Sequence, residues 1–531
     1  MISSTANVYL RPNTMVQPLF NQWYAWSHLI PPASSSMYVL NSHIKIMESF
    51  VSNPQMHISA LKNPAMISGP FIHYDASQVT EIRALLDRTK SEQAHLLELA
   101  EAIKQLNQTL MTEAQGYSLE PLYERVPDVL KGYVELVYDV NNFPQIRFIE
   151  GLLYKSRFYD TSSQSIAMSS IKSDKRPFII NTPQLQSNGN LHLDIPFADR
   201  RLDELFKIKH TPQPFGYIKE VLKIRDKDEE LFSSFFTTEV SQPPVCYDGE
   251  QVRIRYFGHA CVLIESRDVS ILCDPLISYE YPCDNRRYTA VDLPERIDYA
   301  LVTHYHQDHM MLEMLLQMRH KIRTLVVPKS SGVGFIDPSL KLILQTIGFQ
   351  NVMEIDEMES ISIEGGAITG IPFLGEHADL HVRAKTAYQI DIQGQRILCM
   401  ADSNNIEPRL YEHIGAPGKA VDALFIGMEC DGAPLSWVYG PFMPKPLARK
   451  MDQSRRLNGS DCEKAIKIVD CLDARRVYVY AMGQEPWLVF VMGLQYTDNS
   501  RPILESNKLV AACRERGLVS ERLWGHKEMF L

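Results

Sequence analysis

The sequence lacks the features that mark several common protein classes. Nowhere in its 531 residues does an uninterrupted apolar run approach the ~18 residues of a membrane-spanning helix. The opening stretch MISSTANVYLRPNT has no basic start followed by an apolar block, so we expect no secretory signal and a cytoplasmic protein. The formal net charge of −10 argues against a nucleic-acid-binding protein, because such proteins normally carry a basic surplus. We therefore expect neither a membrane nor a nucleic acid among its partners.

Cysteine is absent from the first 245 residues. All nine cysteines lie between Cys246 and Cys513, and they include no CxxC pair. This pattern is typical of reduced thiols rather than of disulfides or iron–sulfur ligands. The change in composition coincides with the stretch TTEVSQPPVCYDGEQ, whose paired prolines resist both helix and central strand. We predict a domain boundary there, with one domain at residues 1–245 and a second at residues 246–531.

The sequence of the predicted N-terminal domain indicates helices and strands but contains no recognisable catalytic or ligand-binding motif. Its stretch from Asp75 to Ala114 carries apolar residues at helical spacing and predicts one long amphipathic helix or a helix pair. The stretches QIRFIEGLLY and PFIINTP predict strands. The sequence here contains no phosphate-binding loop, nucleophile elbow or metal-ligand cluster. We expect a mixed α/β domain that serves dimerisation, giving a homodimer, or the binding of a partner.

The second half alternates strands with helices. Strands are predicted in QVRIRYFGHACVLIES, VSILCDP, DYALVTHY, TLVVPKS, AYQIDIQGQRILCMADS, DALFIGMEC and RRVYVYAMG. Helices are predicted in MMLEMLLQMRHKI and SDCEKAIKIVDCLDA. Such alternation indicates sheets flanked by helices, an α+β fold.

A dense group of metal-ligand residues follows one of these strands. In LVTHYHQDHM, three histidines and an aspartate lie within six positions, namely His304, His306, Asp308 and His309. Residues two apart at the end of a strand point the same way, and the chain then turns toward the next helix. One strand-to-helix corner therefore offers ligands for two metal ions.

The HxHxDH pattern resembles the signature of the metallo-β-lactamase superfamily. The resemblance covers residues 250–531 and implies an αββα sandwich with the metals at one edge of its sheets. It also implies that Asp274 in ILCDPLIS orients a ligand histidine from outside, and that Asp402 in CMADS bridges the two metals. We expect His259 in FGHAC to orient a ligand rather than to bind a metal.

The departures from that superfamily change the expected metal. Where most members supply a further histidine, this chain reads FLGEHADLHV, so that either Glu376 or His377 is the candidate ligand. Where they supply a last histidine, it reads VYVYAMGQEPW and has none. With Glu376 as the ligand, three imidazoles and three carboxylates form an oxygen-rich set, which favours iron or manganese over zinc.

The sequence is therefore similar to the diiron β-hydroxylases of nonribosomal peptide biosynthesis, of the chloramphenicol-pathway type. The similarity rests on HYHQDH, LGEHAD, MADS and GMECDG. It implies an O₂-dependent monooxygenase that hydroxylates the β-carbon of an aminoacyl thioester on a carrier protein. It also implies two iron ions joined as an Fe–O–Fe cluster, an external electron donor, and a catalytic part for Glu376 and for Glu429 beside the cluster. The implied metal ligands are His304, His306, Asp308, His309, Glu376 and Asp402.

Two other functions remain open at this point. One is a zinc-dependent hydrolase of the same fold, acting on a lactone, thioester or phosphodiester through a metal-activated hydroxide. The other is a non-catalytic iron or oxygen sensor. Manganese or zinc is the alternative metal. A basic stretch after Glu429 is a candidate docking surface or lid, and the aromatic residues Trp437, Tyr439 and Trp487 are candidates for lining a pocket.

Overall fold

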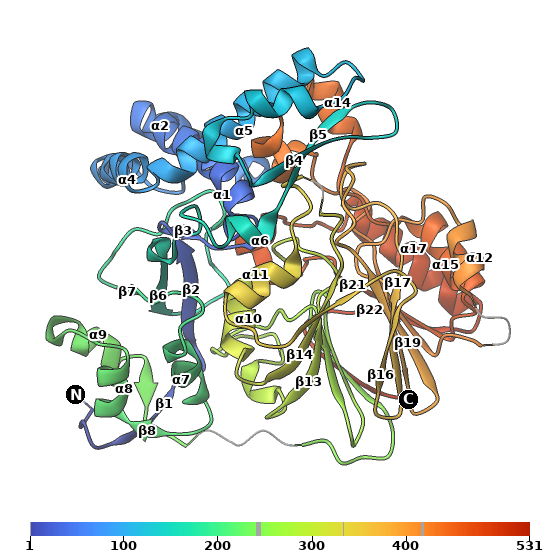
Figure 1. Cartoon of the computed structure of the whole chain (residues 1–531). Coiled ribbons are helices and arrows are strands. Elements are labelled where there is room, and N and C mark those ends of the chain that lie inside the picture. The colour runs from blue at the N-terminus through green and yellow to red at the C-terminus, as the bar shows by residue number, and fades with distance from the viewer. Residues whose placement is uncertain (1, 241–245, 333, 416–418) are drawn as a thin grey trace.

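The computed structural model describes residues 2–240, 246–332, 334–415 and 419–531. Its C-terminal part is a sandwich of two seven-stranded sheets (Figure 1). The first sheet has the order β15-β14-β13-β12-β11-β10-β23, with β10 (Arg253–Gly258), β11 (Cys261–Glu265), β12 (Ser270–Cys273), β13 (Ile297–Leu301), β14 (Ile322–Pro328), β15 (Val352–Ile355) and β23 (Lys527–Phe530). The second runs in chain order, with β16 (Ser360–Ile363), β17 (Gly366–Ile371), β18 (Ala387–Ile392), β19 (Gln395–Cys399), β20 (Ala423–Gly427), β21 (Arg476–Tyr480) and β22 (Val519–Arg522).

Apolar layers hold this sandwich together. Side chains such as Ile254 and Ile264 of the first sheet pack against Ile368 and Ile390 of the second, and all four are fully buried. Burial of this apolar area is the main force that joins the two sheets. Helices cover the outer faces: α10 (Leu312–Met318) and α11 (Leu340–Thr346) on the first sheet, and α12 (Arg409–Ile414), α15 (Cys462–Cys471) and α17 (Arg501–Glu515) on the second.

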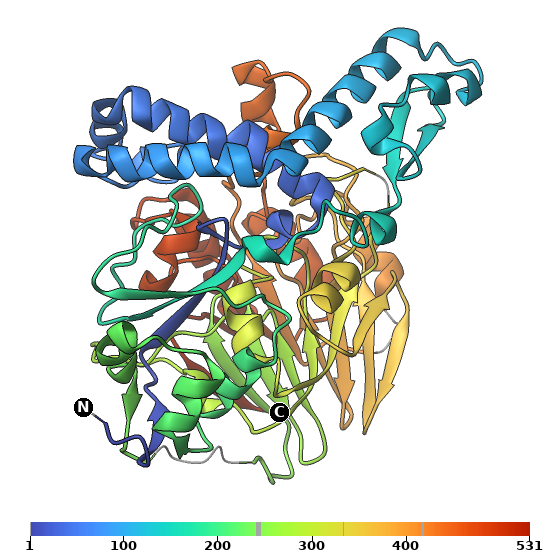
Figure 2. The same cartoon turned by 60° about the vertical axis from the view of Figure 1, so that its left-hand side comes forward.

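The N-terminal part combines small sheets with a helical layer. The sheets are β8-β1-β9, β3-β2-β6-β7 and β4-β5, with β1 (Asn7–Leu10), β2 (Thr14–Phe20), β3 (Trp23–Tyr24), β4 (Val134–Tyr138), β5 (Pro144–Phe148), β6 (Gln164–Ser170), β7 (Asn190–Leu193), β8 (Gln213–Pro214) and β9 (Phe236–Thr237). The helices are α1 (Pro32–Tyr38), α2 (Ile44–Ser52), α3 (Pro54–Ala60), α4 (Val79–Glu92), α5 (Ala94–Glu113), α6 (Glu150–Leu153), α7 (Arg201–Lys207), α8 (Phe215–Val221) and α9 (Glu229–Ser233). In Figure 2 the long α5 reaches from α4 to the β4–β5 hairpin.

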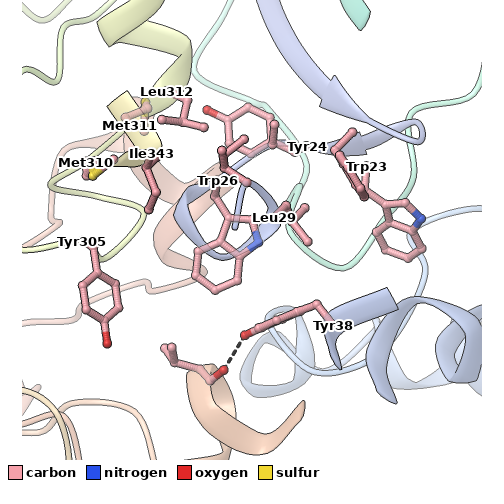
Figure 3. Close-up of a cluster of buried hydrophobic side chains, with 14 of the residues drawn as sticks. Trp23, Tyr24, Trp26, Leu29, Tyr38, Tyr305, Met310, Met311, Leu312 and Ile343 are labelled. Carbon is pink, nitrogen blue, oxygen red and sulfur yellow. Dashed lines mark hydrogen bonds between the residues drawn. The ribbon is translucent and has the colours of Figure 1, made fainter. Parts of the chain in front are cut away.

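One hydrophobic core runs through both parts of the chain. Figure 3 shows aromatic side chains of the N-terminal part, among them Trp26 and Tyr38, beside Tyr305 and Met311 of the sandwich. The Tyr38 hydroxyl donates a hydrogen bond to the carbonyl of Val438 across this boundary (Figure 3). The two parts therefore share buried surface, and the N-terminal part is packed directly on the sandwich.

Buried charges join the two parts as well. The guanidinium of Arg319, 5% exposed, donates to Asp203 Oδ1 at 2.8 Å and to the carbonyls of Phe197, Asp199 and Ile347. Arg176 forms a two-pronged pair with Glu313, whose side chain is fully buried. These contacts are satisfied at both ends, which is the condition for burying a charge without a large penalty.

Several sequence-based expectations can be compared with these elements. The stretch from Asp75 to Ala114 is a helix pair, because α4 and α5 are separated at Gln93. QIRFIEGLLY is a strand only up to Phe148 and continues into α6. The prediction for PFIINTP was wrong: these residues form an irregular segment, where the Ile179 N–H donates to the carbonyl of Phe490 in the other part of the chain.

Two composition-based expectations concern the cysteines and membrane spans. All nine cysteines are free thiols, and five of them are buried. Within the described ranges, none of the helices combines the length and apolar character needed to cross a bilayer. The predicted helix after the HYHQDH motif begins at Leu312, three residues beyond His309, so that the motif itself lies in the turn between β13 and α10.

Candidate metal centre

The proposed ligands come from the turns that follow strands of both sheets. His304, His306, Asp308 and His309 follow β13, and Asp402 follows β19. Glu376 lies in the connection between β17 and β18. Since β13 is parallel to its neighbours β12 and β14, and β19 is parallel to β20, these turns meet at one edge of the sandwich. The fold thus gathers residues that are almost a hundred positions apart.

Ligand atoms converge in three overlapping groups, each with its candidate atoms within 4.8 Å of one another. The groups are His304, His306 and Glu376; His304, His309 and Asp402; and His259, Asp308 and His309. His306 Nδ1 is 2.9 Å from Glu376 Oε1, and His309 Nε2 is 3.0 Å from Asp402 Oδ2. All seven residues are at most 6% exposed.

Several of these buried atoms lack a hydrogen-bond partner. His304 Nε2, His309 Nε2 and Asp402 Oδ1 have none among the described residues. Unpaired buried polar atoms are uncommon in folded proteins because they forfeit their contacts with water. Lone pairs of imidazole and carboxylate aimed at a shared space are the donor set of a transition-metal site, so the residues present fit metal ions.

The electrostatics of the site also favour cations. Burial, followed by the negative charges of Asp402 and Asp308, raises the pKa of Glu376 well above its usual value. Burial and the charges of Asp402 and Glu376 likewise raise the pKa of Glu429. Several carboxyl groups are therefore packed closely enough to oppose one another's ionisation, and divalent or trivalent cations would remove that penalty.

Asp274 fixes the orientation of one histidine. Its carboxylate accepts hydrogen bonds from the backbone N–H and the hydroxyl of Thr303, at 2.8 and 2.7 Å. It also accepts from Nδ1 of His309 at 2.8 Å, which leaves Nε2 of that ring facing the site. This is the role that the sequence indicated for Asp274, and it sets which nitrogen of His309 can bind a metal.

His259 orients Asp308 in a comparable way. The backbone N–H of Gly483 donates to His259 Nδ1 at 3.0 Å, so the proton of the neutral ring is on Nε2. That nitrogen lies 3.1 Å from Asp308 Oδ2 and donates to it. A nitrogen that carries a proton has no lone pair for a metal, so His259 acts on the site through Asp308.

Glu376, rather than His377, faces His304 and His306. His377 directs Nδ1 to the hydroxyl of Tyr439, 2.5 Å away, and belongs to none of the three ligand groups. Of the more distant histidines, His413 lies on α12, and His526 Nδ1 is 3.2 Å from the carbonyl oxygen of Arg286. Neither joins the group around the HYHQDH turn.

The backbone that carries Glu376 is held in an unusual conformation. Glu376, Ala378 and Asp379 have φ values of 66°, 51° and 59°, in the left-handed region that residues other than glycine rarely adopt. Two cationic side chains hold this turn: Lys385 Nζ donates to the carbonyl of Gly375 at 2.8 Å, and Arg455 Nε donates to that of Ala378 at 2.9 Å. Strain of this kind is characteristic of functional sites.

Glu429 is outside the three ligand groups. It follows β20 and belongs to none of the described groups of converging ligand atoms. The charges of Asp402 and Glu376 nevertheless raise its pKa, which places its carboxyl group in the electrostatic surroundings of the centre.

A cleft of about 590 Å³ reaches the HYHQDH turn, although none of the proposed metal ligands is among its lining residues. Its walls come from both parts of the chain and include aromatic side chains, with Trp26, Tyr38 and Phe178 from the N-terminal part and Trp437 from the segment after Glu429. Gln307, between His306 and Asp308, also lines it. Of the three aromatic residues expected to line a pocket, Trp437 lines this cleft and Trp487 lines a much smaller cavity, whereas Tyr439 is buried and lines neither.

The basic stretch after Glu429 divides into two sets. Lys445, Arg449 and Lys450 are exposed. Arg455 and Arg456 are partly buried and have structural partners, since Arg455 binds the carbonyl of Ala378 and Arg456 lies 3.2 Å from the Asp431 carboxylate. The exposed set alone is available to a docking partner.

Comparisons with known proteins agree with this site. The family model described as "Diiron non-heme beta-hydroxylase N-terminal domain" matches residues 9–240, and one described as "Beta-lactamase superfamily domain" matches residues 253–427. The chain is 38% identical, over 97% of its length and 98% of the relative's, to the 4-amino-L-phenylalanyl-[CmlP-peptidyl-carrier-protein] 3-hydroxylase of Streptomyces venezuelae. The chain belongs to the diiron β-hydroxylase family.

Solved structures of diiron β-hydroxylases have the same fold. The crystal structure of CmlA, a diiron β-hydroxylase from Streptomyces venezuelae, matches with a TM-score of 0.93 at 37% identity, covering 99% of this chain and 100% of that one. A CmlA variant with a glutamate changed to aspartate matches with a TM-score of 0.90 at 37% identity and the same coverage. The predicted family, the αββα fold and the preceding N-terminal domain are thus confirmed.

Sequence reasoning missed several contacts of this diiron β-hydroxylase site. Tyr439 was expected only to line a pocket, whereas its hydroxyl lies 3.2 Å from His306 Nε2, the ring nitrogen pointing away from Glu376. Lys385 holds the turn before Glu376, and nothing in its local sequence indicates that contact. The only available signal was for Gln307, which the HYHQDH motif places between two candidate ligands.

Proposed function

We propose that this diiron β-hydroxylase inserts one oxygen atom from O₂ at the β-carbon of an aminoacyl group, held as a thioester on a carrier protein. The observation that supports it most directly is the buried set of three imidazoles and three carboxylates, in which Glu376 stands with His304 and His306. The related hydroxylase from Streptomyces venezuelae acts on an aminoacyl group bound to a peptidyl carrier protein.

The proposed ligand assignment follows from the directions of the side chains. His304 Nε2, His306 Nδ1 and Glu376 would hold one iron, and Asp308 and His309 Nε2 the other, with Asp402 shared by both. Asp402 suits the shared position because Oδ2 lies 3.0 Å from His309 Nε2 and 3.7 Å from His304 Nε2. Glu429 would lie beside the two irons without binding them and would influence the site through the charge of its carboxylate.

The two irons, when bound, would supply the activation of O₂ and the transfer of oxygen. The chain's own residues position the ligands and exclude water. Asp274 holds His309 in the tautomer with Nε2 free, and His259 keeps Asp308 in place by donating to Oδ2. The strained turn at Glu376 keeps that carboxylate beside His306, in a site buried from bulk water.

The cleft supports the proposal for a carrier-bound substrate. Its volume of about 590 Å³ falls within the ~300–1,000 Å³ usual for small-molecule sites, and it opens between the two parts of the chain. We propose that it admits the thioester arm, and its aromatic walls suit an aromatic aminoacyl side chain. The exposed Lys445, Arg449 and Lys450 would attract an acidic carrier domain.

Other parts of the proposal concern assembly and supply. A separate protein would deliver the electrons. The boundary between the parts would lie at residues 245 and 246, in a stretch that falls partly outside the described residues. The N-terminal part would form one wall of the cleft and a homodimer contact. Nine free cysteines are compatible with the reducing cytoplasm as the place of action.

Mass spectrometry of the carrier tests the function. The iron-loaded enzyme, an electron donor and an aminoacyl carrier protein are incubated under ¹⁸O₂, and the acyl group is expected to gain one ¹⁸O atom at the β-carbon. A hydrolase would instead release the acyl group from the carrier without an ¹⁸O₂-derived label, and that outcome would refute the proposal. Metal analysis alongside should find two irons per chain rather than zinc or manganese.

Docking is tested separately. Changing Lys445 and Lys450 to glutamate should raise the KM for the carrier-bound substrate and leave turnover of a small aminoacyl thioester unchanged. Equal effects on the two substrates would show that these residues are not the docking surface. Lys467→Glu is a suitable control, because this lysine is exposed on α15 and pairs with Glu463 within the same helix.

A further inference from the structure

Gln307 is a buried polar side chain that the proposed chemistry has not used. It lies in the HYHQDH turn between His306 and Asp308, and it is only 4% exposed. Its side chain lines the cleft between the two parts of the chain. Its carbonyl oxygen, Oε1, is buried and has no hydrogen-bond partner within the described chain.

The surrounding contacts keep Gln307 in this position. The backbone N–H groups of His309 and Met310 donate to the carbonyl of His306, at 3.1 and 2.9 Å, which closes the turn around Gln307. On either side, His306 contacts the Tyr439 hydroxyl and Asp308 contacts His259. The backbone is therefore fixed, and Gln307, with its buried and unpartnered oxygen, stands in the wall of a cleft that a ligand can enter.

A buried acceptor without a partner is unfavourable unless something else completes it. We infer that a bound substrate does so: Oε1 of Gln307 accepts a hydrogen bond from an N–H group of the aminoacyl thioester. This inference rests on the proposed function. A carbonyl oxygen accepts only, and the substrate offers two kinds of donor, the α-amine of the aminoacyl group and the amides of the carrier's arm.

Of these two donors, the α-amine fits the geometry better. It is two bonds from the β-carbon, and Gln307 is adjacent in the chain to two proposed iron ligands. A hydrogen bond from this residue to the α-amine would bring the β-carbon to the side of the cleft where those ligands lie. Gln307 would then be a specificity residue that selects aminoacyl groups over acyl groups without nitrogen.

The test compares the affinities of iron-loaded enzyme for matched carriers. The probes are a carrier with an aminoacyl group, the same carrier with the des-amino acyl group, and one whose arm has its terminal amide N-methylated. Native enzyme should bind the aminoacyl carrier about tenfold more tightly than the des-amino carrier, as one hydrogen bond predicts. Gln307→Met, which keeps the side-chain length but removes the acceptor, should bind the two equally.

Control measurements separate this effect from a folding defect. Gln345→Met, at an exposed position on α11, should keep the native discrimination. Gln307→Asn keeps an amide on a shorter side chain and should recover part of it. Iron content and the affinity for the des-amino carrier should be the same in native enzyme and Gln307→Met, since neither depends on the hydrogen bond.

Each outcome decides the inference. If Gln307→Met no longer distinguishes the aminoacyl carrier from the des-amino carrier, the α-amine is the donor. If Gln307→Met fails only to distinguish the aminoacyl carrier from the carrier with the N-methylated arm, the arm amide is the donor. If Gln307→Met discriminates in both comparisons as well as native enzyme does, the inference is overturned. A native enzyme that binds none of the carriers would instead contradict the proposed function, which the ¹⁸O₂ experiment tests independently.

Discussion

Removing the hydroxyl of Tyr439 should weaken metal binding without unfolding the protein. His306 turns Nδ1 toward Glu376 Oε1, at 2.9 Å, so in a metal-bound neutral ring the proton is on Nε2. That nitrogen lies 3.2 Å from the Tyr439 oxygen, and His377 Nδ1 is 2.5 Å from the same oxygen. Tyr439→Phe leaves both ring nitrogens without this contact in a buried setting.

The size of the effect follows from these two hydrogen bonds. A neutral hydrogen bond contributes about 0.5–1.5 kcal/mol, and the groups that orient a metal ligand typically account for about 10–100-fold in metal affinity. A hundredfold change corresponds to about 2.7 kcal/mol, near the upper limit for two bonds. We therefore expect Tyr439→Phe to lose its iron at a chelator concentration about 10–100-fold lower than native enzyme requires.

Competition with a chelator, followed by absorption spectroscopy, measures this affinity, and circular dichroism monitors the fold. Tyr154→Phe is the matched control, because the Tyr154 hydroxyl is buried in the N-terminal part with no hydrogen-bond partner among the described residues. Native iron affinity in Tyr439→Phe would refute the orientation of His306 through Tyr439. An equal loss in Tyr154→Phe would show that the effect is not specific to the site.

Three further changes test other parts of the structure. Glu376→His should abolish hydroxylation while still binding metal, as measured by product formation and metal analysis, and undiminished hydroxylation would contradict the place of Glu376. Arg319→Met should lower the free energy of unfolding by about 3–5 kcal/mol in chemical denaturation, because Oδ1 of the buried Asp203 carboxylate and three carbonyls lose their donor, while Arg200 still pairs with Asp203 Oδ2. A change within error would contradict this. Burial, with the charge of Lys321, lowers the pKa of Lys209 in the folded protein to about 7. Burying the ammonium group therefore lowers the free energy of unfolding most below pH 7, and this loss becomes smaller as the pH rises toward the unfolded pKa near 10.5. Lys209→Met should therefore have a higher Tm than native protein at pH 6, with the difference shrinking by pH 9, and a constant difference would refute the assignment.

The spacing of ligand residues could be recognised without coordinates. The HYHQDH stretch follows a run of β-forming residues, and the strand β13 ends at Leu301 just before it. The local sequence was sufficient to predict a cluster of ligands there, because side chains close in sequence at a strand end are also close in space. The same logic identified Asp402, which follows β19. The strand expected in PFIINTP failed because this segment is shaped by contact with the distant Phe490.

The sequence by itself determined which residue types were available for the metal site, and that Glu376 precedes His377 in the position where most members of the metallo-β-lactamase superfamily place a histidine. Only the tertiary structure decided which of the two faces the other ligands, because the left-handed turn at Glu376 is held by Lys385 from just before the next strand and by Arg455 from a distant segment. It likewise decided that Gln307 lines a cleft and that its buried Oε1 has no partner among the described residues, since one wall of that cleft comes from residues nearly three hundred positions away. Donor atoms are a property of the side chain, whereas their direction and burial depend on packing between parts of the chain that the sequence does not place side by side.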